Sequence, residues 1–232
     1  MPGYSGRMRY YPLFLDLADT SVLVVGAGEV GLRKAAVLLR AAPARLDLLD
    51  PVMDEAKTLS RLGTHPLLRL HRRAFAPADI EGRSLVFAAT GKREVNALIS
   101  SLCREKNILC NVADAPDEGN FVVPSLVTAD GLTIAVSTGG QSPALAKNLR
   151  RDLEAWVEKR YSPLLSLLGR LRPRLLALGL PTDENSSIFR RLVNSPLANL
   201  LQDNDYNSAR ELLADILPEP LHHRMGELLD GL

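Results

Sequence analysis

The sequence has few cysteines and no long apolar run, and both shortages limit what the protein can be. Its 232 residues include only two cysteines, Cys103 and Cys110, which are too few for a disulfide framework and lack zinc-site spacing. We therefore expect two buried thiols in a reducing compartment. The opening stretch MPGYSGRMRYYPLFLDL contains no signal-peptide core, and no apolar run approaches the length of a membrane span. These observations predict a soluble cytoplasmic protein without membrane contact.

An excess of charge of either sign is also lacking. The chain carries 28 basic and 27 acidic residues, for a formal net charge of +1. Nucleic-acid-binding domains normally have a strongly basic face, so we expect no nucleic-acid partner. An anionic ligand would have to be bound by local groups. Hydrophobic residues make up 46% of the chain and charged residues 24%, which predicts a packed globular core.

In the first half of the chain, short apolar segments alternate with segments of helical pattern. The expected strands cover residues 21–26, 44–50, 67–72, 84–89 and 108–112, and the expected helices cover 30–42, 53–62 and 93–106. This alternation is typical of an α/β protein with a parallel sheet covered on both faces. We therefore predict a Rossmann-type domain.

The pattern changes after Asp114. Two expected strands, 121–128 and 132–137, flank the turn-forming stretch ADG. Ser142 and Pro143 suit the start of a helix, and the rest of the chain is helical in pattern. Its expected breaks are at the prolines, Pro163, Pro173, Pro181, Pro196 and Pro218. The predicted domains are a parallel-sheet domain over 1–114, a β-rich region over 115–143 and a helical domain over 144–232.

The stretch VLVVGAGEVGLRKA (22–35) places three glycines between the first strand and the first helix. Gly26, Gly28 and Gly31 match the G-x-G-x-x-G spacing of dinucleotide sites, which serves a tight turn, an approach to the pyrophosphate and close helix–strand packing. The helix N-terminus adds N–H groups and the positive end of its dipole. The motif alone is weak, because glycine turns also join strands to helices for structural reasons. The strand before it and the helix after it strengthen the prediction of a nucleotide site.

An acid ends the second expected strand. Asp50 lies 22 positions after Gly28, close to the spacing at which an acid binds the ribose hydroxyls of NAD, and its charge would repel the 2′-phosphate of NADP. We therefore predict NAD as the cofactor. The alternative is that Asp50 only caps the turn before Pro51. Glu29 must point away from the phosphates or bind ribose, and Thr90 either contacts the cofactor or forms a local turn.

Polar residues follow the fifth expected strand, at the sheet edge where ligands bind in open α/β proteins. Asn111 and Asp114 lie there, and an aspartate so placed can act as a general base. The spacing by itself favours a simple Asx-turn before Pro116. The four histidines lack metal-ligand spacing with acids or cysteines, so we expect no metal site.

Seven blocks make the sequence similar to the precorrin-2 dehydrogenase family, which is also the N-terminal family of sirohaem synthases. The blocks are YPLFLDL (11–17), VVGAGEVGLRKA (24–35), FAAT (87–90), VN (95–96), CNVADAP (110–116), FVVPS (121–125) and AVSTGGQSPALA (135–146). Together they are far more specific than the glycine motif. After about residue 161 the chain resembles the family only in being helical.

The resemblance implies a reaction and most of a site. Members oxidise precorrin-2 to sirohydrochlorin with NAD, on the route to sirohaem or cobalamin, and the β-rich region resembles the part that joins two subunits. A homodimer would also cover an exposed strand pair. The resemblance makes Asp114 the catalytic aspartate, and it assigns Glu29, Val30, Asp50 and Pro51 to the cofactor.

The resemblance also implies where the tetrapyrrole binds. The loop that lines its cleft consists of Ser137, Thr138, Gly139 and Gly140. Because the substrate is a polycarboxylate, Lys147 on the following helix is a candidate donor, as is Asn111. A solvated helix face explains any one basic residue there equally well. The sequence departs from the family at Gly31, where alanine is common.

Other functions stay open from the sequence. Some members of the family also insert ferrous iron into sirohydrochlorin, and Asp114 would serve that reaction too. A non-catalytic module that senses NAD or a tetrapyrrole would use the same glycine turn. A dehydrogenase for a small hydroxy acid would need a histidine or lysine acid/base after a later strand, and none is well placed. We expect the last seventy or so residues to form a helical cap over the cleft.

Overall fold

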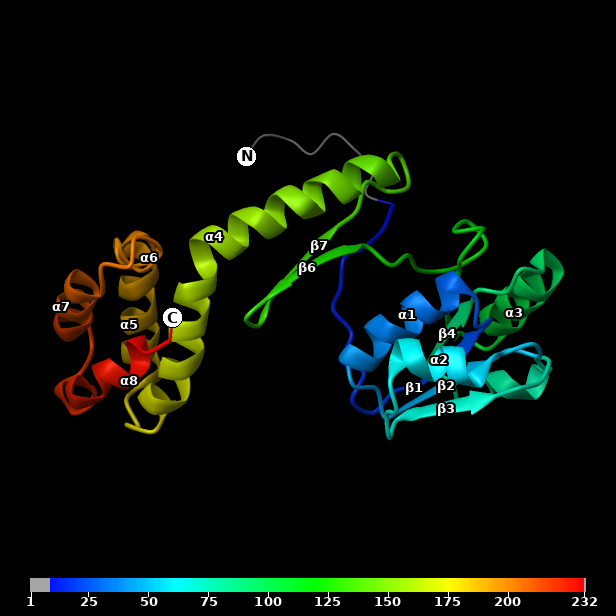
Figure 1. Ribbon diagram of the computed structural model, residues 1–232, viewed down its shortest axis with the longest axis horizontal. Helices are drawn as coiled ribbons and strands as arrows, with labels where there is room; N and C mark the ends of the chain where they lie inside the picture. Colours follow the sequence, from blue (N-terminus) through cyan, green and yellow to red (C-terminus); the bar gives the residue numbers. More distant parts are fainter. Residues whose placement is uncertain (1–8, 232) are drawn as a thin grey trace. The chain divides into compact units, whose positions relative to one another are not determined.

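The computed structural model describes residues 9–231. Contacts divide the chain into two compact units, one ending at Val123 and the other beginning at Pro124 (Figure 1). Residues 115–123 therefore lie in the first unit. The division into regions 1–114, 115–143 and 144–232, which also concerns their roles, stays a prediction. Within residues 9–231, no helix is both long enough and apolar enough to cross a membrane.

The first unit is built on a five-stranded parallel sheet. The strand order is β3-β2-β1-β4-β5, and every neighbouring pair is parallel. The strands are β1 Ser21–Val25, β2 Arg45–Leu49, β3 Leu68–His71, β4 Leu85–Ala88 and β5 Leu109–Val112. The prediction of a Rossmann-type sheet is confirmed. Because the order reverses between β1 and β4, the loops that follow these two strands lie next to each other, as at the ligand-binding crevice of such sheets.

Helices cover both faces of this sheet, which explains why its strands are apolar on both sides. The helices of the unit are α1 Glu29–Arg40, α2 Glu55–Leu62, α3 Arg93–Glu105 and the short 3-10 helix η1 Pro77–Ile80. Successive residues of β1 point to opposite faces. Val24 packs in one core with Leu32 of α1, whereas Val25 packs in a second core with Ile99 of α3. The three predicted helices are confirmed, with no end shifted by more than two residues.

The second unit opens with an antiparallel hairpin of β6 (Ser125–Ala129) and β7 (Leu132–Val136). Asp130 and Gly131 form its turn with φ of +43° and +84°, the positive values that a two-residue hairpin turn requires. The hairpin is as predicted, but the predicted start of its first strand at Phe121 is wrong. The ring of Phe121 packs instead against Phe87 of the first unit, with ring centroids 5.6 Å apart.

The hairpin leads into α4 (Pro143–Leu176), the longest helix, with 34 residues. Its predicted start is confirmed, because the Ser142 hydroxyl accepts a hydrogen bond from the N–H of Leu145. The predicted breaks at Pro163 and Pro173 are wrong, since α4 continues through both. In Figure 1 the α4 ribbon is continuous but changes direction along its length, as helices with internal proline do.

Packing explains why α4 continues through its internal prolines. An internal proline removes one backbone hydrogen bond and crowds the preceding turn. The second part of α4, however, presents leucines at helical spacing to the core of the helical end, and these are almost fully buried: Leu164, Leu167, Leu171 and Leu175. Burial of each side chain contributes roughly 1.5–3 kcal/mol, so together they outweigh the local cost.

Shorter helices complete the second unit. They are α5 Thr182–Asn194, α6 Leu197–Gln202, α7 Tyr206–Ile216, the 3-10 helix η2 Glu219–Arg224 and α8 Met225–Leu229. The predicted breaks at Pro181, Pro196 and Pro218 are confirmed, since each proline lies immediately before a helix. At these positions no helical hydrogen bond is lost, because the first N–H groups of a helix have no partner within it.

Candidate functional site

The turn after β1 brings the chain unusually close to itself. Gly26 has a φ of +106°, and a Cβ atom on it would lie 2.3 Å from the carbonyl oxygen of Ala89. A Cβ atom on Gly31 would lie 1.8 Å from the carbonyl oxygen of Gly26. These two glycines therefore have the packing roles that the motif assigns to its first and third positions.

The middle glycine is different, because it faces open space. A Cβ atom on Gly28 would meet no atom within 4 Å. Gly28 is also the N-cap of α1, and no side chain caps the first N–H groups of this helix. Uncapped N–H groups beside unfilled space form a cradle for an anion. This arrangement fits the pyrophosphate of a dinucleotide.

Asp50 directly follows β2, beside this turn. Its Oδ2 accepts a hydrogen bond from the N–H of Ala27 at 2.8 Å, and its Oδ1 accepts one from the N–H of Val52, also at 2.8 Å. The local turn that the sequence left as an alternative is thus present, and so is a direct link to the glycine turn. Each carboxylate oxygen can accept a further hydrogen bond, so a ribose contact by Asp50 stays a prediction compatible with this geometry. Pro51, which follows, is exposed.

Glu29, the first residue of α1, turns toward α2. Its carboxylate pairs with Arg61 at 2.5 Å, and the hydrogen bond from Arg61 lowers the pKa of Glu29. The pair borders a cavity of about 270 Å³ whose other lining residues are Leu32, Arg33, Ala36 and Leu62. Glu29 therefore has a partner inside the protein. The cofactor contacts expected of Glu29 and of the partly exposed Val30 stay predictions.

A buried amide connects the loop after β4 to the residue expected to be catalytic. Asn96 of α3 is fully buried. It exchanges hydrogen bonds with Thr90 and donates one to Oδ1 of Asp114 at 2.9 Å. Asp114 itself is exposed, just beyond the end of β5. Thr90 also accepts a hydrogen bond from the N–H of Lys92 through its hydroxyl, so the local turn left open by the sequence is present, and its cofactor contact stays a prediction.

Asn111 lies on β5 and is 5% exposed. Its Oδ1 accepts a hydrogen bond from Nζ of Lys34 at 2.7 Å, and its Nδ2 donates one to the carbonyl oxygen of Phe121 at 3.1 Å. The Lys34 ammonium also lies 5.2 Å from the ring centroid of Phe87, and burial lowers its pKa to about 8. Asn111 is thus engaged within the protein, and its contact with a substrate stays a prediction.

The loop expected to line the substrate cleft lies between β7 and α4 in the second unit. The Thr138 hydroxyl accepts a hydrogen bond from the N–H of Ser142 and donates one to its carbonyl oxygen, both at 3.1 Å. Ser137 accepts one from the N–H of Gly139. Gly139 and Gly140 have positive φ, and a Cβ atom on either would meet nothing within 4 Å. The loop is internally fixed, its backbone is open to a ligand, and Lys147 is exposed on the helix that follows.

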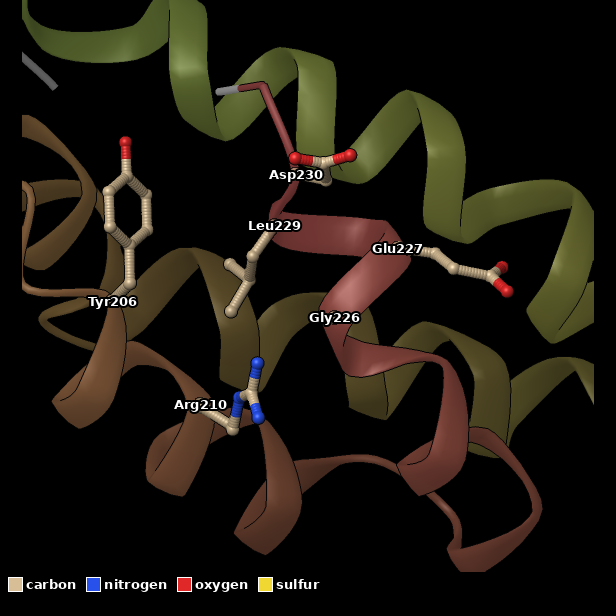
Figure 2. Close-up of a pocket in the computed structure, with 6 residues that line it drawn as sticks. All are labelled: Tyr206, Arg210, Gly226, Glu227, Leu229 and Asp230. Atoms are coloured by element: carbon tan, nitrogen blue, oxygen red, sulfur yellow. The ribbon is translucent and has the colours of Figure 1, made fainter.

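The second unit also contains a cavity of about 360 Å³ that holds none of the predicted site residues. Figure 2 shows its lining from α7 and α8, with the Arg210 side chain directed toward Leu229 and the Glu227 carboxylate directed away. The other lining residues are Tyr206, Gly226 and Asp230. It carries one cation and two acids and has no feature of a nucleotide or tetrapyrrole site.

Histidine and cysteine do not gather into a ligand set in the part of the chain that the structure describes. There, no group of three or more His, Cys, Asp or Glu residues is placed to hold a metal ion. Cys103 and Cys110 are free buried thiols, which confirms the expectation of burial. His71 pairs with Asp47 on the neighbouring strand at 2.5 Å.

Three side chains that matter to this geometry were not among the predicted site residues. Asn96 and Lys34 lie inside blocks quoted for the resemblance, VN and VVGAGEVGLRKA, but the contact of Asn96 with Asp114 and that of Lys34 with Asn111 span 18 and 77 positions. Arg61 lies in an ordinary amphipathic helix, and no sequence signal pointed to its pairing with Glu29.

Comparison with known proteins fits this geometry. Residues 13–125 match the family model described as "Putative NAD(P)-binding", and residues 130–155 match the model described as sirohaem biosynthesis protein central. The fold is similar to that of SirC, precorrin-2 dehydrogenase, with a TM-score of 0.72 over 89% of this chain and 98% of that chain. At 24% sequence identity, this likeness shows the shared fold.

Curated relatives extend the match along nearly the whole chain. Siroheme synthase of Thioalkalivibrio sulfidiphilus is 35% identical over 94% of this chain, and siroheme synthase 1 of Aeromonas salmonicida is 37% identical over 91%. The chain spans less than half of these relatives, 44% and 45% of their lengths. With both family models matched in order on a Rossmann-type unit and a hairpin–helix unit, the chain is similar over nearly its whole length to part of the sirohaem synthases.

Proposed function

We propose that this protein oxidises precorrin-2 to sirohydrochlorin with NAD as the hydride acceptor. The observation that carries the proposal is the exposed Asp114 at the same sheet edge as the glycine turn. Both follow the carboxyl ends of parallel strands, β5 and β1, and ligands of open α/β sheets bind along that edge. A carboxylate base beside a dinucleotide cradle is what a dehydrogenation with proton loss requires.

The residues present fit NAD. Gly28 and the N-terminus of α1 would hold the pyrophosphate, because the space and the uncapped N–H groups are there. Asp50 would accept hydrogen bonds from the ribose hydroxyls, and its negative charge disfavours the 2′-phosphate of NADP. When bound, the nicotinamide supplies the electron sink for a hydride. The contacts of Glu29, Val30, Pro51 and Thr90 belong to the same proposal.

Asp114 would remove the proton that dehydrogenation releases. One of its oxygens is held by Asn96 at 2.9 Å, and the other is available to the substrate. The fixed loop of Ser137, Thr138, Gly139 and Gly140 offers open backbone to the macrocycle, and Lys147 and Asn111 are candidate donors to its carboxylates. These residues would orient the substrate relative to the cofactor, which is the protein's usual contribution in cofactor enzymes.

The working form that we propose is a cytoplasmic homodimer. Within residues 9–231, β6 and β7 pair only with each other, which leaves two strand edges that a second copy could cover. The two buried cysteines are free thiols, as is usual in a reducing compartment. Light scattering on the purified protein tests the dimer, and a charge introduced by Thr133→Glu on β7 should shift it toward the monomer.

The experiment that tests the activity is an anaerobic assay with precorrin-2 and NAD, followed by absorbance of NADH and of sirohydrochlorin. We expect NAD-dependent formation of both products in equal amounts. Asp114→Asn, which keeps the shape of the side chain, should bind NAD normally and lose most turnover. NAD and substrate binding without any product from the unmutated protein would overturn the proposal in favour of a sensing module.

A further inference from the structure

The orientation of the Asn96 amide is dictated by the main chain of Thr90. Oδ1 of Asn96 accepts hydrogen bonds from the N–H of Thr90 at 3.1 Å and from its hydroxyl at 2.6 Å. Nδ2 of Asn96 donates to the carbonyl oxygen of Thr90 at 3.1 Å. A backbone N–H can only donate and a backbone carbonyl can only accept. The amide therefore cannot rotate by half a turn, and its NH₂ group must face Asp114.

This constraint decides how Asp114 is presented. The remaining N–H of Asn96 points to Oδ1 of Asp114, 2.9 Å away, so that oxygen receives a fixed donor. The second oxygen is left for the substrate, since Asp114 is exposed while Asn96 is completely buried.

We propose that Asn96 is a positioning residue that fixes the Asp114 carboxylate, with one chosen oxygen facing the substrate, and that couples it to the loop after β4. This inference rests on the proposed role of Asp114 as the base. The coupling follows from the geometry, because the same amide that contacts Asp114 is saturated by Thr90 in the loop expected to border the cofactor. A shift of that loop on cofactor binding would move Asn96, and with it the Asp114 carboxylate.

Asn96→Asp tests the proposal with a nearly isosteric change. It replaces the donor to Asp114 by a second carboxylate, and two carboxylates at this distance cannot both ionise readily. We expect kcat to fall about 10- to 100-fold at neutral pH, with the KM for NAD changed less than threefold. The acidic limb of the kcat/KM profile should move up by at least one pH unit. An equal loss at every pH, with the limb unmoved, would overturn the proposal, because a merely structural defect gives that result.

Asn120→Asp is the matched control. The amide of Asn120 is likewise held by two main-chain groups. It accepts a hydrogen bond from the N–H of Cys110 and donates one to the carbonyl oxygen of Ile108, but it does not contact Asp114. Asn120→Asp should lose about as much stability as Asn96→Asp. Its pH profile of kcat/KM should match that of the unmutated protein. If Asn96→Asp does not fold, Asn96→Ala removes the donor without adding charge, and kcat should still fall while NAD binding persists. Full kcat in folded Asn96→Ala would overturn the proposal.

A readout without turnover separates this inference from the proposed function. In protein labelled with ¹³C at the aspartate carboxyl carbons, the Asp114 signal can be titrated in unmutated protein, Asn96→Asp and Asn120→Asp. We expect its midpoint to rise by at least one pH unit only in Asn96→Asp. If the unmutated protein fails to oxidise precorrin-2, the proposed function is wrong, and this titration still decides whether the residue at position 96 contacts the Asp114 carboxylate. An unmoved midpoint would overturn the positioning role of Asn96.

Discussion

The main-chain N–H of Ala27 donates a hydrogen bond to the carboxylate of Asp50 at 2.8 Å. Ala27 lies in the glycine turn after β1, and Asp50 directly follows β2, so this bond joins the segments expected to hold the pyrophosphate and the ribose. The second oxygen of Asp50 accepts from the N–H of Val52. Asp50 therefore holds the glycine turn in place through hydrogen bonds within the protein.

Asp50→Asn should lower the stability of the protein and reduce its preference for NAD over NADP. Asparagine has one accepting oxygen, so either the N–H of Ala27 or that of Val52 would face the new NH₂ group. We expect the free energy of unfolding to fall by about 1–3 kcal/mol. Loss of the negative charge should lower the ratio of the Kd for NADP to the Kd for NAD about tenfold. Urea unfolding and calorimetric titration with both dinucleotides provide the measurements.

Asp54→Asn is the control for Asp50→Asn. Asp54 caps α2 by accepting from the N–H of Lys57, and asparagine caps helices about as well as aspartate. We expect little change in stability and none in cofactor choice. An unchanged NADP-to-NAD ratio in Asp50→Asn would show that the Asp50 carboxylate does not face the ribose.

Alanine at two glycines of the same turn should affect different properties. At Gly28 it should weaken NAD binding, and at Gly26 it should lower stability. A Cβ atom on Gly28 meets nothing within 4 Å, so Gly28→Ala should leave the Tm within about two degrees of its original value, by analogy with other surface changes. The methyl group would occupy the space expected for the pyrophosphate and raise the Kd for NAD at least tenfold. Gly26→Ala, at φ +106° with a backbone oxygen 2.3 Å away, should lower the Tm markedly. Unchanged NAD affinity in Gly28→Ala would contradict the proposed cradle.

Much of the first unit could be predicted because its signals are local. Short apolar runs that alternate with segments of helical pattern predicted the five strands, and the glycine spacing predicted a turn that the structure shows at Gly26 and Gly31. Helix ends were less certain, since they depend on caps: α2 begins at Glu55 because Asp54 caps it, two residues later than expected.

What the sequence could not show depends on contacts between distant residues. Lys34 and Asn111 are 77 positions apart, and the link from Asn96 to Asp114 spans 18, so neither pairing has a periodic pattern. The continuity of α4 through Pro163 is similar. A local rule predicts a break, but burial of the leucine face of α4 itself against residues distant in sequence decides the outcome.

Asp47 should make the protein lose stability in acid over a defined range. Its side chain is 1% exposed. Burial raises the pKa of Asp47, but hydrogen bonds from Arg45, His71 and Arg83 outweigh this effect and lower the pKa to about 2. Because the folded pKa is below the unfolded one, the carboxylate stabilises the fold fully above about pH 5, and this contribution, roughly 2 kcal/mol, is lost as the pH falls toward 2.

Asp47→Asn tests this assignment. Asp47→Asn should lower the free energy of unfolding at pH 7 by about 3 kcal/mol, because Arg83 loses a buried partner. It should also make the free energy of unfolding depend less on pH between pH 5 and 2. Urea unfolding at several pH values measures both effects. Glu154→Gln, which breaks the exposed pair with Arg150, should change stability by less than about 1 kcal/mol and keep the acid dependence. An equally steep acid dependence in Asp47→Asn would refute the role of this carboxylate.

Lys34 should make stability rise in alkali. Burial lowers its pKa from 10.5 to about 8, so between these values the unfolded chain binds more protons than the folded one. The free energy of unfolding must then increase as the pH rises from about 8 to 10.5. We expect a gain of about 1 kcal/mol, less than the full shift corresponds to, because solvent screens a partly exposed ammonium.

Lys34→Met should abolish this alkaline gain while keeping an unbranched apolar side chain at this position. Its stability at pH 7 reflects two opposed changes, since the cost of burying the ammonium disappears and Asn111 loses the hydrogen bond at 2.7 Å. The informative quantity is therefore the difference in slope between pH 8 and 10.5, measured by urea unfolding of both proteins. Lys147→Met removes an exposed lysine and should leave the slope as it is. Should Lys34→Met and the unmutated protein gain stability equally over this range, another group is titrating, and the buried ammonium of Lys34 is not the cause.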